Sequence, residues 1–200
     1  KNRMVPAVNE TITAFLMEVK ANRKDEAIEC TNFMKIPHIL AFMDDDNKKL
    51  LASIDEWPRI FIEWDLLSVD KISIREQEYV LTFLTHLCGN RFSKTDPTRV
   101  VKHLLDQVHY KQEDLTRLLE IYLENHRGLI EQNMNLMECL IDRPNGATLS
   151  SVSAIISQDT PARLIDILLN RGMKFENEDL ASLLEKACYF CNVEIVRRLL

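Results

Sequence analysis

The sequence predicts an all-α protein, and three observations support this prediction. Glycine and proline are scarce, with four and six copies in 200 residues, whereas sheets and open loops need many turn residues. Apolar residues recur every three or four positions along most of the chain, which is the spacing of one buried helix face. All four glycines, at positions 89, 128, 146 and 172, fall at predicted helix ends. We therefore expect helices joined by short connections.

The first 92 residues are predicted to form an irregular helical region that precedes a more regular one. Helices are expected over 8–21, 26–35, 38–43, 48–54, 59–67 and 75–87. The acidic run 44–46 ends the third of these helices and can cap the fourth. Residues 60–64 and 72–74 have the β-branched character of short strands. We expect a helix over 60–64, because no strand partner is visible nearby.

An aromatic cluster marks the middle of this region. It consists of Trp57, Phe61 and Trp64, and it is flanked by Glu56 and Glu63. We interpret the cluster as the packing that joins the N-terminal helices to the rest of the chain. The alternative is an exposed anchor for a partner, since aromatic residues dominate the energetics of protein interfaces.

Residues 93–200 show more regular punctuation. Helices are predicted over 98–108, 113–126, 129–141, 148–157, 161–170, 180–188 and 193–200. Asp96 and Thr160 each precede a proline, so each is expected to be an N-cap with proline at the first helical position. Residues 143–146, with the sequence Arg-Pro-Asn-Gly, are expected to form a tight turn.

Four of these helices share a pattern of two apolar residues, two of mixed type and two more apolar residues. The four segments are VVKHLL (100–105), LMECLI (136–141), LIDILL (164–169) and IVRRLL (195–200). Their equivalent leucines are Leu104, Leu140, Leu168 and Leu199, which are separated by 36, 28 and 31 residues. This spacing predicts a solenoid of helical-hairpin repeats. A bundle of amphipathic helices joined by short loops is the alternative.

The segment 161–200 resembles ankyrin repeats, whose period is about 33 residues. Ala187 and Cys188 stand where that family has a pair of alanines, and residues 194–200 match its outer helix. Gly172 stands at the position of the family's hairpin glycine. The Thr-Pro-Leu-His motif of the family does not occur here, and the resemblance fades over 96–160. Armadillo, HEAT or tetratricopeptide-like repeats are the alternative, and the series is expected to continue past residue 200.

The resemblance implies a scaffold or adaptor that binds another protein through its repeat stack. Carried over from the family, the hairpin and the inner helix would supply the partner-binding residues Arg171, Met173, Lys174, Glu176, Glu178, Glu185 and Tyr189. The alternative function is a cytosolic assembly module of a larger channel or multidomain receptor, in which the partner is another subunit. In both cases a chain that stops at Leu200 exposes Leu199 and Leu200, unless further residues cover them.

Composition and motifs argue against several other classes. The net charge of −6 disfavours a general nucleic-acid surface. No apolar run approaches the roughly 18 residues that cross a bilayer, so no direct membrane insertion is expected in this segment. The five cysteines are an odd number without a disulfide framework, which indicates a reducing compartment. We expect an intracellular, most simply cytoplasmic, protein.

We expect neither catalysis nor a cofactor or metal in these residues. Cys188 and Cys191 form a C-x-x-C, but a structural zinc site needs four ligands and no second pair lies at a fitting spacing. We expect Cys188 to pack inside the repeat and Cys191 to occupy the turn. The five histidines form no catalytic or metal-binding motif, and the acidic run 44–46 lacks the further ligands of a calcium loop.

Overall fold

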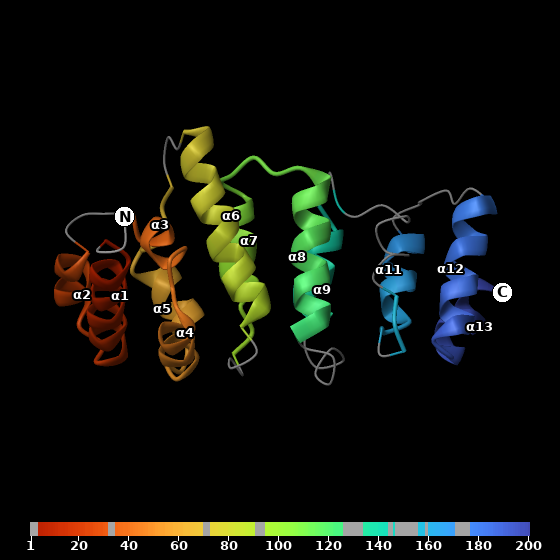
Figure 1. Cartoon of the computed structure of the whole chain (residues 1–200), viewed down its shortest axis with the longest axis horizontal. Coiled ribbons are helices and arrows are strands. Elements are labelled where there is room, and N and C mark those ends of the chain that lie inside the picture. Colours follow the sequence, from red (N-terminus) through yellow and green to blue (C-terminus); the bar gives the residue numbers. More distant parts are fainter. Residues whose placement is uncertain are drawn as a thin grey trace. The chain divides into compact units, whose positions relative to one another are not determined.

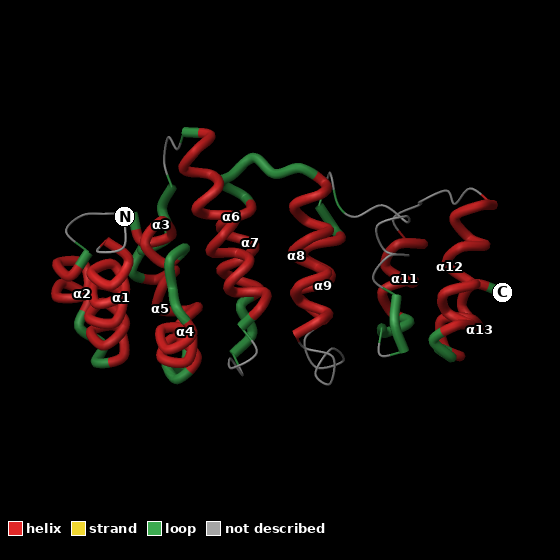
Figure 2. Tube along the Cα trace, viewed as in Figure 1, coloured by secondary structure: helices red, strands yellow, loops and turns green. Residues whose placement is uncertain are grey.

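The computed structural model describes residues 4–31, 35–69, 73–90, 95–125, 134–143, 146, 156–158, 160–170 and 177–200. Every regular element in these residues is an α-helix, which confirms the all-α prediction (Figure 2). The chain divides into two compact units, Lys1–His109 and Tyr110–Leu200. The domain boundary expected after residue 92 was based on the repeat pattern alone. The first helix with that pattern, Thr98–Leu105, belongs to the first compact unit.

The first unit contains the helices α1 to α7 (Figure 1). They are α1 (Met4–Lys20), α2 (Lys24–Cys30), α3 (Ile36–Leu40), α4 (Asp45–Ala52), α5 (Trp57–Glu63), α6 (Ile74–Gly89) and α7 (Thr98–Leu105). Helix α1 contacts α2, α3 and α4, while α3 also contacts α6, and α7 contacts both α5 and α6. The expected helix over 60–64 is confirmed for residues 60–63, which lie within α5.

The core of this unit is built on the predicted apolar face of α1. The buried residues of that face are Ile12, Phe15, Leu16 and Val19. The Phe15 ring lies 5.9 Å from that of Phe61, and the Trp57 ring meets Phe61 edge-on at 5.4 Å. Since Trp57 and Phe61 are both fully buried, they are core residues. The alternative that they form an exposed anchor is therefore wrong.

Helix starts follow local side-chain chemistry, in part as predicted. Asp44 caps α4, because its carboxylate accepts a hydrogen bond of 2.9 Å from the Asn47 N–H. At α7 the prediction was one residue off. The cap position is Pro97, and the helix begins at Thr98, whose N–H donates to the Asp96 carboxylate at 2.9 Å. Asp96 thus bonds to the first N–H of α7 from the position before the cap residue.

The described helices of the second unit are two longer ones, α8 and α12, and three shorter ones. They are α8 (Gln112–Asn125), α9 (Met134–Ile141), α11 (Arg163–Asn170), α12 (Asn177–Tyr189) and α13 (Val193–Leu199). Helix α9 contacts both α8 and α11, and α13 contacts both α11 and α12. The predicted turn after α9 is confirmed by a 2.8 Å hydrogen bond from the Gly146 N–H to the Arg143 carbonyl. Residues 148–155 of the predicted helix at 148–157 lie outside the described residues.

The start of α11 differs from the prediction. The helix begins at Arg163, so Pro161 is not its first residue. The Thr160 hydroxyl accepts a 2.9 Å hydrogen bond from the Ser157 N–H. Thr160 therefore closes the preceding turn, and its own carbonyl is bound by a residue from the end of the chain, as described below.

Three helices end in the same motif without glycine. Asn22, Asp65 and Cys191, which follow α1, α5 and α12, have left-handed backbones with φ of 58°, 56° and 54°. In each case this residue's N–H bonds to the carbonyl three residues back, and the next N–H bonds to the carbonyl five residues back, at 2.8–3.0 Å. This is the Schellman ending, in which glycine is usual. A non-glycine residue costs roughly 1–2 kcal/mol there, less for Asn and Asp.

His86 on α6 gives the first unit a testable pH dependence. Burial lowers the pKa of His86 below its ordinary value of 6.5, and a hydrogen bond to the Ala41 carbonyl, 2.9 Å from Nε2, only partly offsets this effect. Lys48 lowers the same pKa further and Asp45 raises it. Burial likewise lowers the pKa of His38.

We expect His86→Gln to flatten the dependence of stability on pH. Below about pH 6.5 the unfolded chain binds a proton that folded His86 resists, so wild-type stability falls as the pH drops towards the lowered pKa. Above that range His86 is neutral in both states and contributes no slope. Unfolding free energies measured between about pH 7 and pH 5 should therefore change less in the variant. An unchanged slope would contradict this role of His86, and His38→Gln provides the parallel test.

Candidate interaction surface

Three apolar side chains are exposed together at the turn between α12 and α13, and we call them the turn patch. They are Tyr189, Phe190 and Val193, which are 81%, 36% and 58% exposed. The two aromatic rings meet edge-on with centroids 5.0 Å apart. Single exposed apolar residues are ordinary on protein surfaces. Two adjacent aromatics with a valine in one short turn are less ordinary, since aromatic residues are enriched where proteins bind each other.

Buried residues of α12 and α13 support the turn patch. Leu183 and Ala187 of α12 and Ile195 of α13 are fully buried. The Schellman ending stops α12 directly after Tyr189 and sends the chain into α13. Cys191 lies in this turn, as predicted. Cys188, in contrast, is exposed, so the prediction that it packs inside the repeat is wrong. The small side chain on the buried side is Ala187, one residue earlier.

Asn192 fixes the position of the turn. Its buried side-chain amide donates to the carbonyls of Ser157, Gln158 and Thr160 at 3.0, 3.2 and 2.8 Å. Its carbonyl oxygen accepts from the Ile195 N–H at 3.2 Å and so caps α13. One side chain thus starts α13 and ties it to a loop more than 30 residues earlier in the chain.

The structure describes three of the seven predicted partner-binding residues. Glu178, Glu185 and Tyr189 are all exposed, and their spacings of seven and four place them on one face of α12. The other four, Arg171, Met173, Lys174 and Glu176, lie outside the described residues. The role of all seven in binding stays a prediction.

Sequence reasoning missed Phe190 and Val193 as site residues. The available signal was their position, because a turn between two helices normally carries polar residues or glycine. Tyr189 and Phe190, with Val193 three residues after Phe190, depart from that rule and place apolar surface in solvent.

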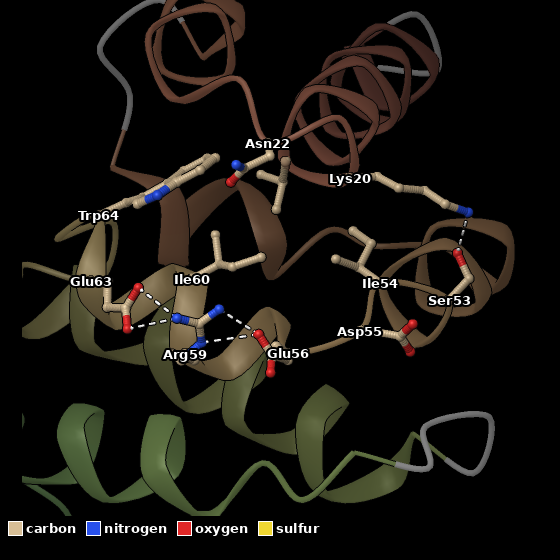
Figure 3. Close-up of a pocket in the computed structure, with 11 residues that line it drawn as sticks. Lys20, Asn22, Ser53, Ile54, Asp55, Glu56, Arg59, Ile60, Glu63 and Trp64 are labelled. Atoms are coloured by element: carbon tan, nitrogen blue, oxygen red, sulfur yellow. Dashed lines mark hydrogen bonds and ion pairs between the residues drawn. The ribbon is translucent and has the colours of Figure 1, made fainter.

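The first unit has a groove of about 540 Å³ between the C-terminal end of α1, the α4–α5 loop and α5 (Figure 3). Ile54 and Ile60 give it an apolar part. Arg59 projects between the carboxylates of Glu56 and Glu63 and pairs with both (Figure 3). Hydrogen bonding to Glu56 raises the pKa of the Arg59 guanidinium above its ordinary range.

The polar groups of this groove are largely engaged with each other. Lys20 Nζ donates to Ser53 Oγ at 3.0 Å, and Ser53 Oγ donates to the Leu50 carbonyl at 2.8 Å. The Ser53 hydroxyl is thus bonded to Lys20 and to the Leu50 carbonyl. The Arg59 guanidinium pairs with Glu56 through Nε and Nη2 and with Glu63 through Nη1. The polar groups described here are already paired with each other, so they offer little to a new ligand. The turn patch exposes apolar surface that a partner can bury, so it is the stronger candidate site.

No protein-family model, curated protein or solved structure matches the chain. Within the parts that the structure describes, no helix is both long and apolar enough to cross a membrane. Across the same described ranges, with their gaps, no three His, Cys, Asp or Glu side chains gather where they could hold a metal ion.

Proposed function

We propose that this chain is a helical-repeat scaffold that binds another protein through the turn patch. The observation that carries the proposal is Tyr189, which is 81% exposed and lies edge-on against Phe190. Apolar surface left in water is worth about 25 cal/mol for each Å² that a partner covers. A tyrosine also supplies a hydroxyl that can form a hydrogen bond with the partner or with water at the interface.

The order of contacts in the second unit supports the repeat part of the proposal. The short helices α9, α11 and α13 carry the equivalent leucines Leu140, Leu168 and Leu199, which are 28 and 31 residues apart. Helix α9 contacts α11, and α11 contacts α13. This order of contacts is the one expected if each short helix belongs to a hairpin that packs on its neighbours in a repeat stack.

Polar contacts within each unit recur at similar separations. In the first unit the Asn90 amide donates to the Lys48 carbonyl, 42 residues earlier, and the Val69 N–H donates to Gln107, 38 residues later. In the second unit the Gln112 amide donates to the Gly146 carbonyl, 34 residues later, and Asn192 reaches back by 32–35 residues. Hydrogen bonds between a side chain and the backbone about one repeat away are expected where consecutive hairpins stack.

Within this proposal the repeats are of the ankyrin-like type, on the strength of residues 187–188 and 194–200. Armadillo- or HEAT-type hairpins are the structural alternative. The partner is a separate protein in the scaffold form of the proposal. It is another subunit if the chain is an assembly module of a larger channel or receptor.

The substitution pair Tyr189→Ser and Val193→Ser tests the proposal. Both side chains are exposed, so their loss should leave folding intact, while losing an aromatic anchor should lower partner recovery by about tenfold or more. The readout is quantitative mass spectrometry of proteins captured by the tagged chain from cells. Met17→Ser is the matched control, since Met17 is 52% exposed in the other unit. An unchanged partner set in the double variant would refute the proposed surface.

A further inference from the structure

Two exposed thiols lie at the two ends of the turn that carries the aromatic rings. Cys188 is the last residue but one of α12, and Cys191 follows in the turn; both are reduced and exposed. The Cys191 N–H donates to the Cys188 carbonyl at 3.0 Å. A hydrogen bond between residues three apart brings their Cα atoms within about 7 Å, and a disulfide needs a Cα separation of about 4.4–6.8 Å.

Hydrogen bonds on both sides of Cys191 fix the backbone that holds this pair. The left-handed φ of 54° at Cys191 is fixed by the Schellman hydrogen bonds on one side. On the other side it is fixed by the buried Asn192 amide, which is bound to three carbonyls. The thiols thus keep their short separation without any closing of a loop, and this raises their effective concentration towards each other. Cys30, Cys88 and Cys139, the other three cysteines, are half-buried or buried.

We propose that Cys188 and Cys191 are a reversible thiol–disulfide site, which goes beyond the binding function above. The oxidant is a low-molecular-weight disulfide, RSSR. One protein thiolate attacks a sulfur of RSSR, so that a mixed disulfide forms and one RSH leaves after taking up a proton. The second protein thiolate attacks the protein sulfur of the mixed disulfide and releases the second RSH. The protein loses two electrons and two protons, and RSSR becomes two RSH.

The oxidised form closes a ring across the turn patch. Tyr189 and Phe190 are the two residues enclosed between the cysteines, so the bond fixes the backbone on both sides of the exposed aromatic pair. In a reducing compartment the site stays a dithiol, and it oxidises when the pool of small disulfides rises. The thiol pair and the exposed aromatic surface therefore lie in the same turn.

The test equilibrates the whole, folded chain with glutathione and glutathione disulfide over a range of ratios, followed by acid quenching and alkylation. Trypsin cuts after Lys186 and Arg197, so both thiols lie in the single peptide 187–197. We expect two of the five thiols to become unreactive together, and this peptide to appear unlabelled and lighter by two hydrogens than the dithiol. Cys191→Ser should leave Cys188 at the mixed disulfide, one glutathione heavier.

Three outcomes would overturn the inference. Peptide 187–197 could stay doubly alkylated at every ratio, it could carry glutathione on each cysteine without an internal bond, or it could cross-link two chains. Any of them would show that the turn does not hold the thiols in bonding geometry. None of them depends on partner binding, so a failure here is distinguishable from a failure of the proposed function.

Discussion

Replacing Asn192 by alanine is expected to lower the free energy of unfolding by about 2–4 kcal/mol. The two amide hydrogens of this side chain serve three loop carbonyls, and its oxygen caps α13. Alanine would leave these carbonyls and the Ile195 N–H without their partner in a buried place. Denaturant unfolding of the whole chain measures the effect.

Two further variants make this prediction specific. Asn125→Ala is the control, because Asn125 is exposed and its amide donates only to the Ile121 carbonyl within its own helix. We expect a change within about 0.5 kcal/mol. Asn192→Asp keeps an oxygen for the cap but faces the loop carbonyls with a carboxylate, so it should be no better than alanine. An Asn192→Ala variant as stable as the Asn125→Ala variant would show that the amide does not hold the loop.

Substituting the equivalent leucines by alanine is expected to give a graded series. Leu104, Leu140 and Leu168 are fully buried, and each change should cost about 2–5 kcal/mol through lost burial and the cavity left behind. Leu199 is half-exposed at the end of the described chain, so Leu199→Ala should cost less than about 1 kcal/mol.

The series tests whether the shared pattern marks one structural position. Unfolding of the four variants in the same denaturant gives the comparison, and similar denaturant dependence is needed to interpret it. If Leu199→Ala were as costly as the others, Leu199 would have to be buried against a further surface. If Leu140→Ala and Leu168→Ala cost almost nothing, the pattern would have no structural meaning.

Helices could be predicted from the sequence because apolar periodicity is a local signal. The buried face of α1 follows directly from residue spacing, whereas residues 60–63 were assigned to a helix because no strand partner was visible nearby. The helix ends were harder. Glycine was the expected stop signal, but α1, α5 and α12 end on Asn22, Asp65 and Cys191. These residues accept a left-handed backbone because the Schellman hydrogen bonds compensate for its cost.

The candidate site was predictable only in part. Tyr189 was found from the resemblance. Cys188 was assigned to the interior because it stands with Ala187 at the family's alanine pair, but Ala187 is buried and Cys188 is exposed. Asn192 looked like an ordinary turn residue. Its structural role depends on carbonyls 32–35 residues earlier, and no local pattern connects two such distant segments.

Photo-cross-linking from position 189 shows whether the turn patch binds a protein. A benzophenone amino acid replaces Tyr189 in the chain expressed in cells, and irradiated samples are compared with a chain that carries the same group in place of Met17. Binding at the turn patch should give a discrete adduct heavier than the chain from position 189 and none from position 17. Equal or absent adducts at both positions would contradict it.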